Sequence, residues 1–163
     1  MLNIDKSKFN KDQLNMITKC EEEGIDVSVI NNPEYSEEQM KYILAGVKEG
    51  LDISCYNKPG ISLLELESIY FGLKANPKMA QYVNKGYTPR QMSILSACLQ
   101  DNIEDVDTIA NPKYSYEQMN AFYLQRLNGI KVTKNDIDKL STDSAKALIN
   151  KLAYDDCTYK LDI

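Results

Sequence analysis

A pattern of apolar and polar residues recurs along this chain at intervals of 26 positions. The best-preserved copy is residues 35–59, YSEEQMKYILAGVKEGLDISCYNKP. Matching pairs lie 26 positions apart at Ser36 and Ser62, Ile43 and Ile69, and Gly46 and Gly72. A period of this size is typical of a repeat array, in which each unit buries its apolar face by stacking on its neighbours.

Six units can be placed, and each opens with the signature of a helix start. The units begin at Phe9, Tyr35, Ile61, Tyr87, Tyr114 and Leu140. The second residue of each unit can accept hydrogen bonds from the free N–H groups of a helix start: Asn10, Ser36, Ser62, Thr88, Ser115 and Ser141. Three residues later, five units carry a Gln or Glu that predicts a capping box: Gln13, Gln39, Glu65, Gln91 and Gln118.

Within each predicted helix, apolar residues recur at spacings of three and four, which indicates one buried face. One further position stays small, which predicts close approach by a neighbouring helix or connector: Cys20, Gly46, Gly72 and Cys98. The helices are predicted to stop at residues that tolerate a left-handed turn: Gly24, Gly50, Asn76, Asn102 and Gly129.

The connectors carry an apolar pattern of their own, so we do not expect loose loops. One turn of 3₁₀ or α-helix fits their length. It would begin at Asp26 or Asp52 and end before Pro33 or Pro59.

We therefore predict an all-α fold, a short α-solenoid of six 26-residue repeats, each one helix plus a short helical or 3₁₀ return. The expected organisation is a single helical-repeat domain over residues 1–163, with an N-terminal cap over 1–8, five repeats over 9–139 and a degraded C-terminal capping repeat over 140–163. In that last repeat, Ser144 and Ala145 replace Gln and Met, and the helix is predicted to end at Asp155 and Asp156.

The repeat, S-x-x-Q-M-x-x-I-x-x-G followed by G-L/I-D-V/I-S, resembles the "QM" repeats in proteins of phages, plasmids and other mobile elements of Firmicutes. The second unit matches at Ser36, Gln39, Met40, Ile43, Gly46, Gly50, Leu51, Asp52, Ile53, Ser54, Tyr56 and Pro59. The later connectors depart from the pattern, with Lys78 and Lys131 where Asp is usual. The resemblance implies a helical scaffold without catalytic residues and, by association, an inhibitor of host defence such as an anti-CRISPR protein.

Composition and charge narrow the function classes. The chain is 43% apolar and 26% charged, as in ordinary soluble proteins, and its formal net charge of -5 argues against a phosphate-binding surface. No apolar run approaches the ~18 residues of a membrane span, and MLNIDKSKFN lacks the apolar core of a signal peptide. We expect a cytoplasmic protein. Its cysteines, interpreted as reduced thiols with a disulfide framework as the alternative, are Cys20, Cys55, Cys98 and Cys157.

No catalytic or cofactor motif is found. The chain has no histidine, which excludes Ser-His-Asp and Cys-His nucleophile arrangements and most zinc sites. It also lacks a Walker loop, GxGxxG and GxSxG. The acidic run Asp101, Glu104, Asp105 and Asp107 lacks the Gly and the closing Glu of an EF-hand, and we interpret it as a solvated connector. No cofactor or metal is predicted.

Tyrosine is the most suggestive remaining feature, with eleven Tyr against three Phe and no Trp. Tyrosine is favoured at protein interfaces because its rigid apolar ring ends in a polar group. Candidate partner-binding residues are Tyr42, Tyr70, Phe71, Tyr116, Tyr123, Arg126, Glu21, Glu22 and Glu23. The alternative is that the tyrosines are half-buried between adjacent helices and that the three glutamates are an exposed charged end.

The favoured function is a non-enzymatic protein–protein interaction module, such as a mobile-element inhibitor of a host defence complex. One alternative is an enzyme with an unrecognised carboxylate/tyrosine site in a deep pocket. Another is an acidic nucleic-acid mimic, recognisable by a row of carboxylates. Direct DNA binding is not expected, because it would need basic residues gathered on one face: Lys41, Lys48, Lys74, Lys78 and Arg90. Self-association stays open, since the ends of a repeat array invite stacking.

Overall fold

The computed structural model describes the backbone of residues 4–159 and the side chains of residues 4–153. Its α-helices are α1 (Lys11–Glu23), α2 (Glu37–Glu49), α3 (Leu63–Ala75), α4 (Pro89–Gln100), α5 (Tyr116–Leu127), α6 (Lys134–Lys139) and α7 (Thr142–Tyr159). Its 3₁₀ helices are η1 (Lys6–Lys8), η2 (Val27–Ile30), η3 (Ile53–Cys55), η4 (Pro77–Gln81) and η5 (Val106–Thr108). Every regular element in residues 4–159 is helical, which confirms the predicted all-α class.

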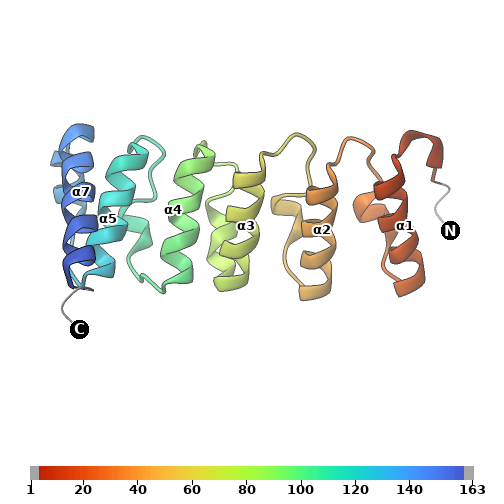
Figure 1. Ribbon diagram of the computed structural model, residues 1–163, viewed down its shortest axis with the longest axis horizontal. Helices are drawn as coiled ribbons and strands as arrows, with labels where there is room; N and C mark the ends of the chain where they lie inside the picture. Colours follow the sequence, from red (N-terminus) through yellow and green to blue (C-terminus); the bar gives the residue numbers. More distant parts are fainter. Residues whose placement is uncertain (1–3, 160–163) are drawn as a thin grey trace.

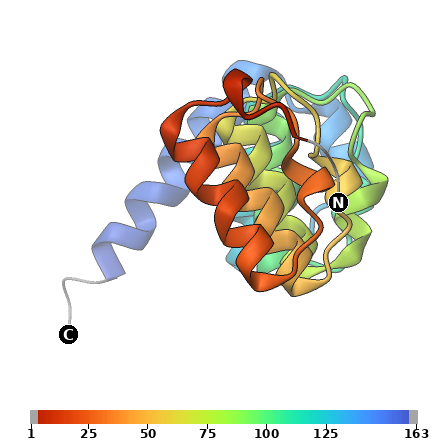
Figure 2. The ribbon, with the colours of Figure 1, turned by 90° about the vertical axis from the view of Figure 1, so that its right-hand side faces the viewer.

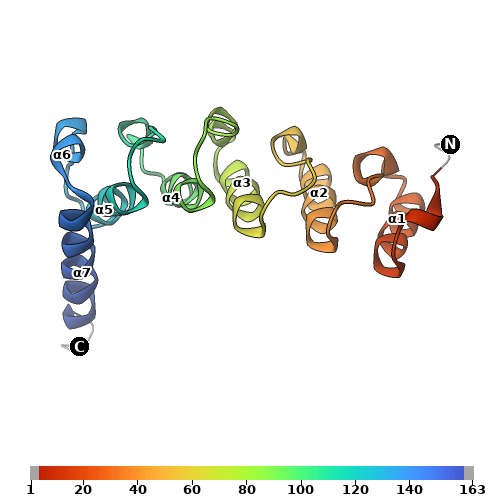
Figure 3. The same cartoon turned by 90° about the horizontal axis from the view of Figure 1, so that it is seen from above.

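The helices α1 to α5 lie side by side in chain order, in a single row (Figure 1). Seen from above, the 3₁₀ helices η2 to η5 and α6 lie along one side of this row (Figure 3). The main contacts join elements that are neighbours in the chain; η2 packs between α1 and α2, and η4 between α3 and α4. The row therefore has one face covered by connectors and one open face.

The predicted helix starts are confirmed in all six units. The side chains of Asn10, Ser36, Ser62, Thr88 and Ser115 each accept a backbone N–H from the first turn of the following helix. Ser141 does the same for α7, where its Oγ lies 3.1 Å from the backbone nitrogen of Ser144. The N-cap side chains thus fix where each helix begins.

The predicted capping boxes form at only three of five helices, with Gln13, Gln91 and Gln118. Glu65 instead forms an ion pair with Lys58 at 3.7 Å. Gln39 uses its amide nitrogen to donate to the carbonyl oxygen of Lys58 in the next connector. For these two helices the prediction was wrong: the Glu65 carboxylate pairs with Lys58, and Gln39 accepts no hydrogen bond from the backbone N–H of Ser36.

The four glutamines have a second role that links adjacent units. Gln13 donates from Nε2 to the carbonyl oxygens of Tyr35, at 2.7 Å, and of Pro33, at 3.1 Å. The amides of Gln39, Gln91 and Gln118 likewise donate to carbonyls 19 to 23 residues further on. We call these four residues the glutamine clamp. Because buried carbonyls need donors, each clamp ties the start of one helix to the chain entering the next.

The small position in α2 and in α3 receives a side chain from the connector that follows the helix. A Cβ added to Gly46 would lie 1.8 Å from the hydroxyl of Tyr56, and one added to Gly72 would lie 2.6 Å from Cγ of Met79. Tyr56 and Met79 are both fully buried. The predicted close approach is confirmed at these two glycines, and the approaching group is the helix's own connector.

The connectors also form as predicted. Asp26 and Asp52 precede η2 and η3, and their side chains accept the backbone N–H groups of Ser28 and Ser54. Left-handed turns follow the helices at Gly24, Gly50, Asn102 and Gly129.

Asn76 is an exception to the predicted helix stops. Its φ is -158°, which is extended backbone. Pro77 follows it, and a residue before proline is pushed toward extended conformations. The side chain of Asn76 accepts the N–H of Lys78 instead and begins η4.

The last helix differs from the prediction at its end. Helix α7 continues through Asp155 and Asp156 to Tyr159. No Gly or Pro interrupts it, and an Asp inside a helix costs no more than ~0.7 kcal/mol relative to Ala. Helix α7 runs in a different direction from α1 to α5, and its far end projects away from them (Figure 2).

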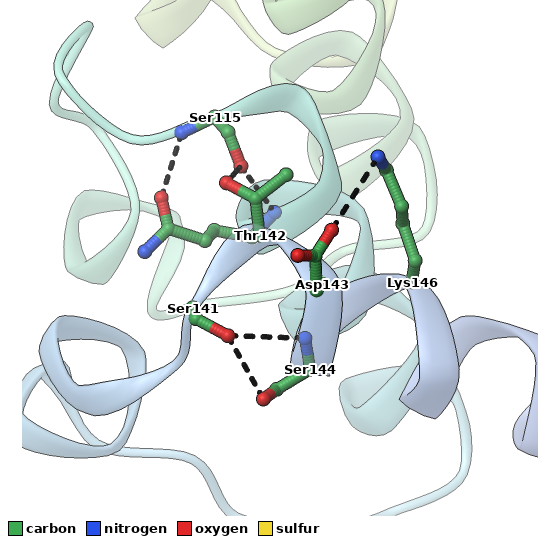
Figure 4. A network of polar contacts seen from close by, with 7 residues as sticks. Ser115, Ser141, Thr142, Asp143, Ser144 and Lys146 are labelled. Carbon is green, nitrogen blue, oxygen red and sulfur yellow. Dashed lines mark hydrogen bonds and ion pairs between the residues drawn. The ribbon is translucent and has the colours of Figure 1, made fainter.

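The start of α7 packs on the start of α5 through small hydroxyl groups (Figure 4). Thr142 Oγ1 lies 3.3 Å from Ser115 Oγ, the N-cap oxygen of α5. Ser144 stands at the glutamine position, but it hydrogen-bonds to Ser141 in its own helix start. This short side chain replaces the clamp with a local contact.

Candidate partner-binding surface

Two side chains face each other across each boundary between helices, and their size differs along the row. Between α2 and α3 they are Tyr42 and Tyr70, whose rings meet edge to face at 4.9 Å. The corresponding residues 26 positions on are Ser68 and Ser96, which line a small hollow between α3 and α4. Helices α3 and α4 are the most closely packed pair in the row. The bulky tyrosine rings thus lie in the boundary between α2 and α3.

The separation of α2 and α3 leaves a hollow of about 360 Å³ between them. We call it the α2–α3 groove, and its lining residues are Glu38, Lys41, Tyr42, Ala45, Leu63, Glu67 and Tyr70. The small Ala45 and the two aromatic rings give it a largely apolar interior. A recess of this kind suits side chains from another molecule.

Three large apolar side chains are exposed on α3 beside this groove. Leu63, Leu64 and Phe71 are 49%, 44% and 42% exposed, and we call them the α3 ridge. The opposite face of α3 is buried through Leu66 and Ile69. A helix that is apolar on both faces is normally covered on both. Helix α3 therefore has exposed large apolar side chains in addition to its buried ones.

Hydrogen bonds fix the rings in the groove. The hydroxyl of Tyr42 donates to Glu67 at 3.0 Å, and that of Tyr70 donates to Glu49 at 3.0 Å. Lys74 lies 3.0 Å from the same Glu49 oxygen and 5.5 Å from the centre of the Tyr70 ring. Three aromatic rings meet here, because Phe71 lies edge to face against Tyr70 at 5.1 Å. These contacts within the chain thus fix the positions of the rings.

The titration properties of these tyrosines suit a binding role. Burial, followed by the hydrogen bond to Glu67, raises the pKa of Tyr42. Burial and the hydrogen bond to Glu49 raise the pKa of Tyr70 in the same way. Both hydroxyls are therefore protonated at neutral pH and act as donors, whereas general-base catalysis needs a pKa near the working pH.

The other predicted site residues lie elsewhere. Arg90 stacks on the ring of Tyr116 at 4.6 Å. Tyr123 donates to Asp101 at 2.6 Å, and Arg126 pairs with Asp105 at 3.0 Å. These contacts join α5 to α4 and its connector, so Tyr116, Tyr123 and Arg126 belong to a separate part of the row from Tyr42, Tyr70 and Phe71 (Figure 1).

The three glutamates form a third location, at the end of α1. Glu21, Glu22 and Glu23 are all exposed. Glu23 pairs with Lys48 of α2 at 2.6 Å, and Glu21 pairs with Lys6 at 3.7 Å. The structure therefore divides the predicted partner-binding residues into three groups rather than one surface.

The acidic run after α4 connects neighbouring units. Asp107 accepts hydrogen bonds from Lys78 at 2.6 Å and from Tyr82 at 2.8 Å. The bond from Lys78, followed by that from Tyr82, lowers the pKa of Asp107. Among the described residues, no group of three or more His, Cys, Asp or Glu side chains is placed to hold a metal ion.

The cysteines are buried thiols. Cys20, Cys55 and Cys98 are free and buried, and the side chain of Cys157 lies outside the described residues. Burial raises the pKa of Cys98 to about 12 and that of Cys55 to about 11. Because the thiolate is the nucleophile, these thiols are unreactive at neutral pH.

Sequence reasoning missed Leu63, Leu64 and Ala45, although the repeat contained a signal for two of them. Leu63 and Leu64 stand where the preceding unit has Glu37 and Glu38. An apolar pair at positions that are charged in another copy indicates a local change of surface.

No protein family, curated protein or solved structure matches this chain. Within residues 4–159, no helix has both the length and the apolar character needed to cross a membrane.

Proposed function

We propose that the six units form a short α-solenoid that acts as a non-enzymatic protein-binding module. Support for the solenoid comes from the main contacts, which join chain neighbours, and from the glutamine clamp, which recurs from unit to unit. Such stacking is how units too small to fold alone bury a continuous core. The binding surface in this proposal is the α2–α3 groove together with the α3 ridge.

The observation that carries the binding role is the exposure of Leu63, Leu64 and Phe71 beside an apolar recess. Aromatic side chains in a preformed pocket are the usual centre of a protein interface. Two carboxylates and two tyrosines line the groove, and the raised pKa values of Tyr42 and Tyr70 keep both hydroxyls protonated as hydrogen-bond donors.

Charge pairing favours a protein partner over nucleic acid. Candidate phosphate contacts are engaged with neighbouring side chains, in the pairs Lys48–Glu23, Lys74–Glu49, Lys78–Asp107 and Arg90–Tyr116. Their positive charge is offset or shielded, and phosphate binding depends on such charge. The same pairing interleaves lysines with carboxylates, which does not suit a nucleic-acid mimic.

The resemblance to "QM" repeats of mobile elements also suggests where the protein acts and on what kind of partner. In that setting the chain acts in the cytoplasm as a phage or mobile-element inhibitor, and its partner is a protein of a host defence complex such as CRISPR-Cas. This extension rests on the repeat motif and not on the groove.

Affinity capture with matched surface variants tests the proposal. The first variant is Leu64→Ser with Phe71→Ser, and the control is Leu127→Ser with Ile130→Ser. The control residues are exposed to a similar degree, 50% and 43%, on another part of the row. Quantitative mass spectrometry of host lysates should show a partner that the wild type and the control retain and the first variant loses. Equal capture by all three proteins, or by none, contradicts the proposal.

A further inference from the structure

We propose a further interaction surface at the C-terminal ends of α2, α3 and α4, where an extended segment of a partner protein binds through two basic side chains. This surface shares no lining residue with the α2–α3 groove, so the inference goes beyond the proposed function. It follows from two equivalent hollows between neighbouring units, from the carboxylate that lines each of them and from the helix ends beside them.

The two hollows lie at successive boundaries of the row. The Asp52 hollow, of about 370 Å³, lies between the second and third units, and the Glu104 hollow, of about 230 Å³, lies between the third and fourth. Five of the six residues that line the Asp52 hollow have a counterpart 26 positions on that lines the Glu104 hollow. These pairs are Gly50 and Asn76, Asp52 and Lys78, Leu73 and Leu99, Pro77 and Ile103, and Ala80 and Val106. The repeat therefore builds the same kind of hollow twice, one unit apart.

Each hollow combines a buried apolar side chain with an exposed carboxylate. Leu73 lines the Asp52 hollow and Leu99 lines the Glu104 hollow, and both leucines are buried. Asp52 and Glu104 are both exposed. A lysine or arginine side chain matches this combination, because its aliphatic stem packs on apolar groups while its charged end stays at the surface.

The two carboxylates are available to a partner. No ion pair within residues 4–153 involves Asp52 or Glu104. Hydrogen bonds from the hydroxyl of Ser54, at 2.5 Å, and from its N–H, at 3.1 Å, lower the pKa of Asp52, which is therefore charged at neutral pH. Lys78 also lines the Glu104 hollow, but it is paired with Asp107 at 2.6 Å. Each hollow thus keeps a negative charge.

The helix ends add to the negative potential. Gly50 follows α2 and lines the Asp52 hollow, whereas Asn76 follows α3 and lines the Glu104 hollow. Asn102, just after the end of α4, lines the Glu104 hollow as well. The end of a helix carries about half a negative charge and leaves carbonyl oxygens without a partner inside the helix. The side chains and the backbone therefore favour a cation independently of each other.

The separation of the two carboxylates suits an extended segment. Asp52 belongs to the second unit and Glu104 to the fourth, and packed helices lie roughly 8–10 Å apart, so two units span roughly 16–20 Å. Six residues in the polyproline II conformation advance roughly 19 Å and return a side chain to the same face. The segment therefore has basic residues at positions i and i+6. Its backbone forms no internal hydrogen bonds, so it can bond to the helix-end carbonyls and to the amides of Asn76 and Asn102.

Three designed peptides test the inference by an amide NMR titration of the full chain. The first is proline-rich, with a central leucine and two lysines six positions apart. The second has the same composition with the lysines adjacent, and the third has glutamates in place of the lysines. The first should bind about tenfold more tightly than the others, because only it reaches both carboxylates at once. Its largest shifts should fall on Gly50, Asn76 and Asn102.

Each unfavourable outcome of the titration has a clear meaning. Equal binding of the adjacent-lysine peptide overturns the spacing, and equal binding of the glutamate peptide overturns the charge assignment. If the first peptide does not bind, or shifts residues elsewhere, the inference fails. A helical peptide with the same two lysines, if it binds more tightly than the first, overturns the extended conformation.

Variants of the protein locate the binding site. Asp52→Asn with Glu104→Gln should weaken the first peptide about tenfold. Asn also caps helices, so the start of η3 is kept. The control, Glu34→Gln with Glu117→Gln, removes the same formal charge near the helix starts and should bind like the wild type. If the control weakens binding equally, the peptide senses only the net charge of the protein, and the inference is overturned.

The outcome is independent of the proposed function. Leu64→Ser with Phe71→Ser should bind the first peptide like the wild type, because neither residue lines the two hollows. If this variant loses the peptide, the peptide lies on the α2–α3 surface and the inference fails, whereas the proposed function stands. If the variant keeps both the peptide and every partner captured from lysate, the proposed function fails and the inference stands.

Discussion

The boundary between α2 and α3 differs from the boundary between α3 and α4 in its facing side chains and in how closely the helices pack. Toward α2, the rings of Tyr42 and Tyr70 meet between the helices, and the clamp from Gln39 ties the two units together. Toward α4, the corresponding positions are Ser68 and Ser96 and the helices pack closely. This second boundary has Glu65 at the clamp position, and a carboxylate cannot donate to a carbonyl.

The difference separates the residues that build the scaffold from those that shape the surface. Ser68 donates to the carbonyl of Leu64 in its own helix, and Ser96 accepts from Gln100, so neither needs a partner across the boundary. Close packing leaves a hollow of only about 160 Å³ there, against about 360 Å³ beside the tyrosines. The larger hollow thus lies at the boundary with two tyrosine rings, and the smaller one at the boundary with two serines.

The largest loss of stability should come from changing a small helix position that contacts the connector, a feature found in both α2 and α3. Gly46→Leu places a side chain where the Tyr56 hydroxyl lies. We expect a loss of about 1–3 kcal/mol or more in the free energy of unfolding, since overpacking forces neighbouring groups to move. Urea denaturation measures the loss. Ala75→Leu, at an exposed position at the end of α3, is the control and should change little. An unchanged melting temperature for Gly46→Leu contradicts the packing of the connector on α2.

Converting the closed boundary into the open kind gives the next effect. Ser68→Tyr with Ser96→Tyr should cost about 1–3 kcal/mol, because the close packing of α3 on α4 has no room for the rings. The reverse change, Tyr42→Ser with Tyr70→Ser, should close the recess at the cost of buried aromatic surface. A crystal structure of the Ser-to-Tyr variant with unchanged helix separation would refute the spacing argument.

Changes at the clamp position should have a smaller effect on the free energy of unfolding. Removing a clamp should lower stability, and adding one where it is missing should raise it. Gln91→Leu leaves the carbonyls of Pro112 and Tyr114 without their donor. The expected cost is about 1–3 kcal/mol, toward the lower end where water can reach them. Glu65→Gln supplies the missing clamp between the third and fourth units and should gain about 0.5–1.5 kcal/mol. Thermal melts of both variants measure the changes, and a destabilised Glu65→Gln variant counts against the clamp.

The smallest expected effect is on the pH dependence of stability, which should differ between the two boundaries. The folded protein raises the pKa values of Tyr42 and Tyr70 above the ordinary value of 10.0. Their contribution is therefore complete below pH 10 and is lost as the pH rises through the folded pKa values. Tyr42→Phe with Tyr70→Phe should reduce the loss of stability above pH 10. The Ser68→Ala variant, at the closed boundary, should not change how stability falls with pH above pH 10. If the double tyrosine variant also loses stability as steeply as the wild type, Tyr42 and Tyr70 do not contribute to this loss.

The sequence predicts what is encoded within one unit. Ser36, Asp52 and Gly46 act locally, through caps and through a connector close in the chain, so their spacing is sufficient to assign them. The clamp escaped prediction because its acceptors lie in the following unit, and a capping box explains the same glutamine equally well. The groove escaped because it depends on Tyr42 and Tyr70 meeting across a boundary, which periodicity alone does not place.

The site residues show the same limit. Tyrosines at comparable positions, such as Tyr70 and Tyr123, bond to carboxylates of neighbouring units. Their residue type does not reveal which of them borders a recess. Leu64 stands where every other copy has a charged residue, and it was the more informative signal.

Photo-crosslinking in host cells tests the central claim most directly. A photoreactive phenylalanine analogue is placed at position 71, beside the open boundary, or at position 127, which is at least as exposed in the wild type. The account predicts that a discrete protein is crosslinked from position 71 and not from position 127. Crosslinking from 127 alone, from both alike, or from neither would contradict it.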